Sequence, residues 1–161
     1  MLAAIVAVAD AASAQTLEGC TVVELTDPAR RAYECTGGLV LEAEAAAELG
    51  LAAPGADDAT TEITLRSGAV LVDVDPGRPV QIRTPQAIAA VRGTQYVVDA
   101  TTDATAVFVV RGAVSVRRAG ESDGSVVLGP GDGVDVTLGG ELVVRQWRPE
   151  RARALLARLG R

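Results

Sequence analysis

The chain has 161 residues, 48% of them apolar, so it can form one domain with a sizeable buried core. It contains no histidine, which excludes histidine-based acid–base catalysis, serine–histidine and cysteine–histidine nucleophile pairs, and most zinc sites. The net charge of −6 is uneven, because residues 1–60 carry two Arg against ten acidic residues and residues 142–161 carry six Arg against one. An acidic body with a short basic tail has no basic stripe, so we expect no binding to nucleic acid.

The N-terminus resembles a secretory signal peptide. Leu2–Ala9 is a short apolar run, and Ala12-Ser13-Ala14 has the small-residue pattern of a cleavage site. We therefore expect residues 1–14 to be removed on export, leaving a soluble periplasmic protein. The apolar run is too short to span a bilayer. A buried helix or a disordered alanine-rich end is the alternative.

Residues 15–60 predict a disulfide hairpin followed by an acidic linker. Cys20 and Cys35 flank strand-like segments on either side of an Asp27-Pro28 turn signal, so a hairpin would bring the two sulfurs together. In an oxidising compartment they should form a disulfide. Two buried reduced thiols are the alternative, and a metal pair lacks further ligands. Leu39–Glu42 predicts another strand, and the alanine-rich segment 42–58 predicts a short helix and then a loop.

Residues 61–145 are rich in valine and read as an all-β domain. Short β-prone runs separated by Gly and Pro turns indicate a compact sandwich, a jelly roll or a short β-solenoid. The candidate strands are Glu62–Arg66, Ala69–Val74, Val80–Arg83, Ile88–Arg92, Gln95–Ala100, Ala106–Val110, Ala113–Arg117, Ser125–Leu128, Val134–Thr137 and Leu142–Arg145.

Several short motifs follow one another in this region in a fixed order. A Thr-Pro turn is followed by a V-R-G-T element, an aromatic strand, a V-x-G-x-V hairpin and a G-x-G turn. Together they resemble the FecR domain family over roughly residues 62–137. The matching positions are Thr84, Pro85, Val91, Arg92, Gly93, Thr94, Tyr96, Val110, Gly112, Val114, Gly129 and Gly131.

Most of these motif residues suit structural roles. Pro85 fixes its own φ and holds Thr84 extended, which makes a corner between strands. Gly93 suits a bulge or a positive φ, and Gly112 suits a turn. Arg92 is different, because an Arg inside an apolar strand needs an acidic or carbonyl partner. We expect a structural ion pair there in preference to a ligand site.

Residues 146–161 predict an amphipathic C-terminal helix. Pro149 suits its first position and Gly160 its end, and an apolar stripe recurs at helical spacing. The stripe consists of Ala152, Leu155, Leu156 and Leu159. We expect a cap docked on the β-domain, with Trp147 as an anchor and the arginines free. The alternative is a recognition element in which Trp147, Arg151 and Arg158 contact a partner or an anionic membrane surface.

No motif for catalysis, a cofactor or a metal is found, so we predict that the protein is not an enzyme. The FecR resemblance implies an envelope regulator that senses a transporter and controls a sigma factor. That role requires an anti-sigma segment and a membrane span, which we do not find. We therefore expect a periplasmic FecR-like module that binds an envelope or membrane-bound signalling protein. The alternative is a glycan-binding or surface-assembly module, although scarce aromatic residues disfavour sugar stacking.

Overall fold

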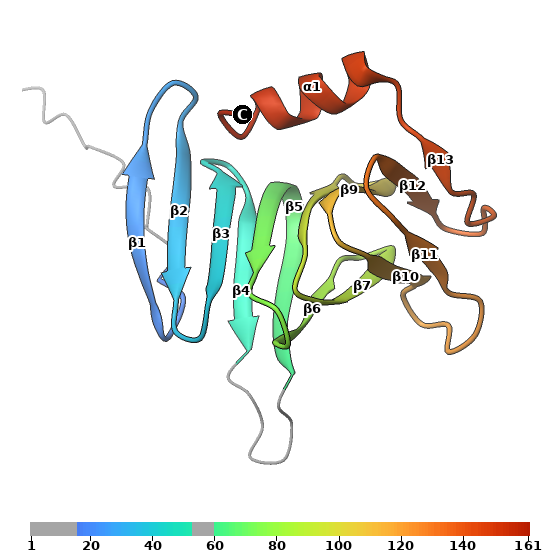
Figure 1. Ribbon diagram of the computed structural model, residues 1–161, viewed down its shortest axis with the longest axis horizontal. Coiled ribbons are helices and arrows are strands. Elements are labelled where there is room, and N and C mark those ends of the chain that lie inside the picture. Colours follow the sequence, from blue (N-terminus) through green and yellow to red (C-terminus); the bar gives the residue numbers. More distant parts are fainter. Residues whose placement is uncertain (1–15, 53–59) are drawn as a thin grey trace, which may run out of the picture.

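The computed structural model describes residues 16–52 and 60–161, and the predicted signal peptide lies outside this range. Strands dominate the described chain, and a helix follows the last of them (Figure 1). In chain order the elements are β1 (Cys20–Leu25), β2 (Arg30–Cys35), β3 (Leu39–Glu44), β4 (Glu48–Ala52), β5 (Thr61–Val74), β6 (Pro79–Arg83), β7 (Ala87–Arg92), β8 (Gln95–Ala100), β9 (Ala104–Arg111), β10 (Val114–Arg118), β11 (Val126–Leu128), β12 (Asp132–Thr137), β13 (Arg145–Gln146) and α1 (Pro149–Ala157).

The arrangement confirms an all-β fold with a C-terminal helix. Backbone ladders join the strands into one sheet that curls into a half-barrel, and β5 belongs to both of its walls. We call the wall ordered β1-β2-β3-β5-β8-β9-β12-β13 sheet A. The wall ordered β4-β5-β6-β7-β10-β11 is sheet B. Strands β5 and β6 are parallel, and the other paired strands are antiparallel.

A bend in one long hairpin folds the sheet over. Strands β3 and β4 both run antiparallel to β5 and are separated by a short turn at residues 45–47. Opposite this turn Gly68 has a φ of +89°, and a Cβ added there would lie 2.8 Å from Ala47 Cα. Only glycine fits this backbone without displacement, so β5 passes from sheet B to sheet A at Gly68.

Two predictions for this hairpin are wrong. The segment from Glu42 does not form a helix but ends β3 and then forms β4, and residues 53–58 of that prediction lie outside the described chain. The segments Glu62–Arg66 and Ala69–Val74 are not separate strands but parts of β5. Pairing with β5 outweighs the helix propensity of alanine, because it buries every second side chain of residues 39–43.

Valine and leucine side chains from the two walls fill the half-barrel. Alternation sets the two faces of each strand, so in β8 Tyr96 and Val98 point into the core while Val97 points outward. At one end the hydroxyl of Thr84 accepts a hydrogen bond from the Ala87 N–H at 2.9 Å and lies 2.7 Å from the Thr105 hydroxyl. The Thr105 hydroxyl donates to Gln86 at 2.8 Å, so the polar groups at the Thr-Pro corner are satisfied internally.

Only the end of the last predicted strand forms. The sequence predicts Leu142–Arg145, whereas β13 consists of Arg145 and Gln146 paired with the start of β12. Gly139, with a φ of +82°, turns the chain away from the end of β12 before it can pair. Between them Val143 and Val144 are exposed, whereas Leu142 is partly buried against the core.

The helix α1 begins at Pro149, as predicted, and is followed by Gly160 with a φ of +75°. Leu155 and Leu159 are buried, and Ala152 and Leu156 are partly buried, so the apolar stripe does face the domain. Within the described residues no helix is both long and apolar enough to cross a membrane.

Candidate protein-binding site

The C-terminal helix closes the outer face of sheet A. Strand register sets an apolar row across this face, in which Leu71, Val97 and Phe108 lie side by side on β5, β8 and β9. Leu155 and Leu159 of the helix segment pack on this row and form a second hydrophobic cluster outside the half-barrel. The sequence prediction that the helix is a docked cap therefore agrees with the position of its leucines.

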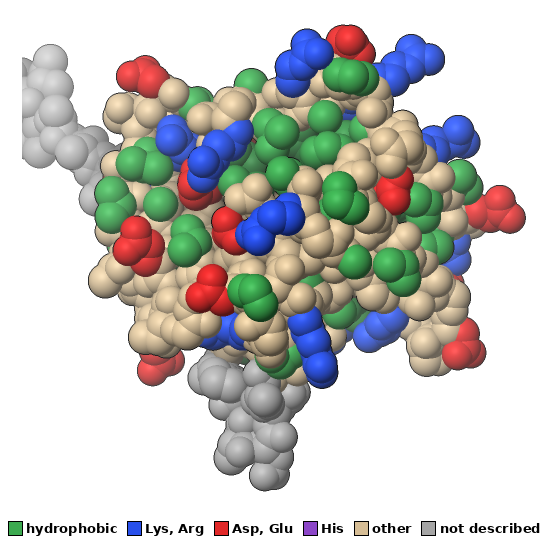
Figure 2. Space-filling model, viewed as in Figure 1, with side chains coloured by type: hydrophobic (Ala, Val, Ile, Leu, Met, Phe, Trp, Pro, Cys, Tyr) green, Lys and Arg blue, Asp and Glu red, His purple; other side chains and the backbone are tan. Residues whose placement is uncertain are grey.

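Carboxylates border the apolar row, and the helix arginines neutralise them. Arg151 contacts Asp135 at 2.5 and 2.9 Å. Arg158 bridges Glu44 at 2.7 Å and Asp99 at 2.6 Å. Arg161 pairs with Glu42. The expectation that the tail arginines are free is wrong for these three, because the acidic body of the chain supplies their partners. Figure 2 shows basic and acidic side chains beside one another on the viewed face rather than in separate patches.

Glu44 links the helix to the bend in the sheet. Its Oε2 accepts a hydrogen bond from the Ala69 N–H at 2.9 Å and another from Arg158 at 2.9 Å. Partial burial raises the pKa of Glu44, but the hydrogen bonds from Arg158 and Ala69 outweigh it and hold the pKa below its usual value. Glu44 is therefore charged at neutral pH and ties β3, β5 and α1 together.

Trp147 anchors the segment that leads into the helix, as predicted. Its ring stacks on Phe108 with centroids 5.0 Å apart, and the Arg151 guanidinium lies 3.7 Å from the Trp147 centroid. A Cβ at Gly133 would overlap the indole, so this glycine makes room for the ring. Trp147, Arg151 and Arg158 do lie on one side of the protein, but each of them contacts the chain itself.

The helix does not cover the outer face of sheet B, where Ala90 and Arg92 are exposed and Ile88 is buried. Alternation and register place three rows of side chains across β6, β7 and β10. The middle row is Gln81, Ala90 and Ser115, and it continues to Val127 of β11. These residues line a shallow groove of about 460 Å³. The groove is the candidate site, because it is an open recess on the one broad face that the helix leaves uncovered.

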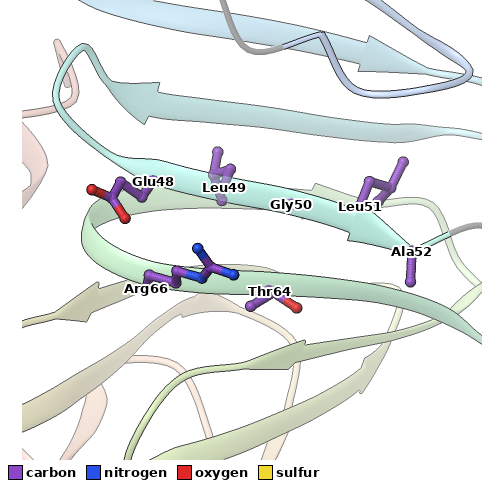
Figure 3. A pocket seen from close by; sticks show the side chains of 7 residues that line it. All are labelled: Glu48, Leu49, Gly50, Leu51, Ala52, Thr64 and Arg66. Atoms are coloured by element: carbon purple, nitrogen blue, oxygen red, sulfur yellow. The ribbon is translucent and has the colours of Figure 1, made fainter.

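A second shallow recess, of about 370 Å³, lies on sheet B where β4 pairs with β5. Figure 3 shows Leu49 and Leu51 pointing to one side of β4, with Thr64 and Arg66 extending from β5. Glu48 and Arg66 are exposed at the end of the recess nearest the bend. Both recesses therefore open on the same wall of the half-barrel.

Arg92 borders the groove. It ends β7 with an exposed side chain, and no carboxylate in residues 16–52 or 60–161 lies within ion-pair distance of it. The predicted structural ion pair stays a prediction, because Asp57 and Asp58 lie outside the described residues. Alternation explains the exposure, since Arg92 falls on the same outward face as Ala90 while Val91 points into the core.

The turn after Arg92 is tightly packed. Gly93 has a φ of +75°, which confirms the predicted positive φ, and a Cβ there would lie 2.6 Å from Pro76 Cα. Gly112 has a φ of +87° in the next turn, and a Cβ there would lie 2.4 Å from Thr94 Cγ2. Thr94 itself is buried. The V-R-G-T and V-x-G-x-V motifs thus meet at one rigid corner beside the groove.

The remaining motif residues have local structural roles. Thr84 is buried in the polar relay described above, and Pro85 is exposed at the corner beside it. The Gly129 N–H donates to Asp132 Oδ2 at 2.9 Å, and Gly131 has a φ of +84° in the same turn. This turn holds the start of β12, against which β13 pairs.

The sequence analysis did not identify the groove, nor two exposed or partly exposed arginines of sheet B, Arg66 beside the second recess and Arg117 of β10. The sequence did contain a signal, because both residues occupy the polar phase of strands with alternating burial. The order of the strands, which brings β5, β6, β7 and β10 together in one wall, could not be predicted from the sequence.

The predicted disulfide forms between Cys20 and Cys35, which are opposed in the β1–β2 ladder. Among the described residues no group of three potential metal ligands occurs. Burial raises the pKa of Tyr96 above its usual value, so its hydroxyl stays protonated in the core.

Comparison with solved structures shows the same fold in a proposed anti-sigma factor from Parabacteroides distasonis. Two crystal structures of it, at 2.50 and 1.65 Å resolution, match with a TM-score of 0.64 and 20% sequence identity. The matches cover 85% and 84% of this chain, which spans only 64% of that protein in each case. No curated protein matches.

The family match begins about 40 residues before the region in which the sequence motifs were recognised, residues 62–137. The model described as FecR protein matches residues 22–115, more than half of the chain, and the match includes the second strand of the disulfide hairpin. It also includes the V-R-G-T corner and most of the groove-lining strands. The chain therefore belongs to the FecR family.

Proposed function

We propose that this protein is a non-catalytic, exported FecR module that binds a signalling protein of the bacterial envelope through the open face of sheet B. The main support is the asymmetry of the half-barrel. One outer face is closed by the chain's own helix, and the other has two recesses and an exposed Arg92 that has no ion pair within the described residues. FecR membership supports a role in signalling or regulation.

Export to the periplasm is supported by two independent features. Residues 1–14 have the pattern of a cleavable signal peptide. The Cys20–Cys35 disulfide is the kind of bond that persists in oxidising compartments. The boundaries 15–60, 61–145 and 146–161 remain useful as descriptions of hairpin, body and tail, although all three parts pack into one domain.

Protein binding is favoured over glycan binding because the aromatic side chains are committed to the fold. Tyr33, Tyr96 and Phe108 are buried, and Trp147 lies between Phe108 and Arg151. Sugar recognition usually stacks a ring on an exposed aromatic face, which these four residues do not offer. The absence of histidine from the sequence likewise favours a binding module over a hydrolase.

Cross-linking in the native bacterium tests the proposal. The tagged full-length chain is fixed with formaldehyde, and the envelope fraction is captured and identified by mass spectrometry. We expect a partner protein whose recovery falls about tenfold with Arg92→Glu, because a charge reversal at the groove costs on the order of 1.4 kcal/mol. Arg153→Glu, an exposed helix arginine, is the matched control and should leave recovery unchanged.

The N-terminus and the mass of the captured protein test whether it is exported. The mature protein should begin at Gln15 and weigh two hydrogens less than its reduced form. Equal recovery from the wild type and Arg92→Glu, or an uncleaved cytosolic chain with free thiols, would contradict the proposal.

A further inference from the structure

We infer that the open face of sheet B recognises an acidic, extended segment of its partner. The inference rests on the proposed function and adds the chemistry of the ligand. Its starting point is the distribution of charge on a protein whose net charge is −6. The outward-facing positions of β4, β5, β6, β7 and β10 in sheet B include four arginines and two carboxylates. The arginines are Arg66, Arg83, Arg92 and Arg117, and the carboxylates are Glu48 and Glu62.

These arginines are less neutralised than those on the other wall. Arg83 contacts Glu62 at 3.4 Å, and Arg117 donates to the carbonyl oxygen of Glu121 without an ion pair to any described carboxylate. Arg66 and Arg92 are exposed without an ion pair in the described residues. On sheet A, by contrast, Arg151 and Arg158 each contact carboxylates at 2.5 to 2.7 Å. Within the described residues, the outer face of sheet B therefore carries more arginines than carboxylates.

Arg92 lines the groove itself, and the register places Arg83 and Arg117 in the row on the other side of its floor. Arg83 and Arg117 lie in one row, each opposite Ile88 of the intervening β7. They are therefore two strand spacings, about 10 Å, apart. Arg92 lies on the far side of the Ala90 row, four residues along β7 from Ile88, which is about 13 Å. The row between them, with Gln81, Ala90 and Ser115, forms the groove floor, and beyond Gln81 this row ends at Glu62 of β5.

An extended chain fits this pattern better than a helix or a flat surface. The recess is shallow and its floor mixes Gln81 and Ser115 with Ala90, so it lacks the deep apolar slot that an amphipathic helix needs. Successive side chains of an extended segment point to opposite sides. A segment lying over Ala90 would thus direct carboxylates alternately toward Arg92 and toward Arg83 and Arg117. Guanidinium groups bind carboxylates through paired hydrogen bonds, which favours acidic residues at these positions.

Fluorescence anisotropy of a labelled deca-glutamate peptide tests the inference on the oxidised full-length chain. We expect saturable binding that weakens steeply between 20 and about 200 mM salt, because the contacts are exposed charges. Arg92→Glu and Arg117→Glu should each weaken binding by about tenfold. Arg153→Glu should change it by less than about twofold, and circular dichroism should show the same fold in all variants.

Three results would overturn the inference. The first is that deca-glutamate shows no saturable binding at low salt. The second is that Arg153→Glu weakens binding as much as Arg92→Glu does, and the third is that the protein binds phosphatidylglycerol vesicles in preference to the peptide. The two proposals can fail separately. Envelope capture that depends on Arg92 without peptide binding would reject the acidic segment and retain the binding face. Loss of both would reject the face itself.

Discussion

Gly93→Val is expected to destabilise the domain by roughly 3 kcal/mol or more, enough to lower its melting temperature by on the order of 10 °C. Gly93 has a φ of +75°, where a β-branched side chain is strained. An added Cβ would also lie 2.6 Å from Pro76 Cα, and the obstacle is backbone rather than a movable side chain. Thermal melts followed by circular dichroism measure the effect.

Gly77→Val separates the two causes. Gly77 has a φ of +87°, but a Cβ there has nothing within 4 Å, so this variant adds backbone strain without the collision. It should melt between the wild type and Gly93→Val. Arg92→Ala should melt close to the wild type, since its side chain is exposed and unpaired among the described residues. A Gly93→Val protein as stable as Gly77→Val would show that the contact with Pro76 is not restrictive.

Leu155→Ala is the second large effect, with an expected cost of about 2–5 kcal/mol. Leu155 is 6% exposed and packs on the apolar row of sheet A, so its truncation leaves a cavity between helix and sheet. The melting temperature should fall by on the order of 10 °C. Ala154, an exposed neighbour, gives the matched control as Ala154→Gln, which should change little. An unchanged melt of Leu155→Ala would mean that the helix does not contribute to domain stability.

The ion pairs of the helix should contribute less to the free energy of unfolding than its buried leucines do. Arg158→Gln should cost about 1 kcal/mol, because Arg158 is partly exposed and its contacts with Glu44 and Asp99 are screened by solvent. The pKa of Glu44 is lowered in the folded state, so this stabilisation is fully present above its usual pKa of 4.5 and is lost as pH falls below that value. The difference between the wild type and Arg158→Gln should therefore shrink in acid.

The fold class could be predicted from the valine-rich body, yet the hairpin before it could not. Residues 39–52 have many alanines and glutamates, which favour a helix in isolation. The same segment alternates, with Leu39, Leu41 and Ala43 buried and the residues between them facing out. Alternation was the better guide, because β5 supplies a long partner strand that a local propensity cannot anticipate.

The candidate site was harder to predict than the fold. Arg92 was identified as unusual, but its surroundings depend on which strands lie beside β7, and those strands are distant in the sequence. The uneven distribution of charge along the chain did indicate one feature of the structure. The basic tail and the acidic body pair with each other through Arg151 and Arg158, which leaves the other wall as the open one.

Photocross-linking from two exposed alanines, one on each outer face, is the most direct test of which face binds the partner. Ala90 lies on the floor of the open groove, and Ala157 is exposed on the helix that covers the opposite face. Benzoylphenylalanine is incorporated at each position in full-length protein, and cells are irradiated before envelope proteins are separated. We expect adducts from position 90 that Arg92→Glu reduces, and none from position 157. Adducts from position 157 in the absence of any from position 90 would contradict it.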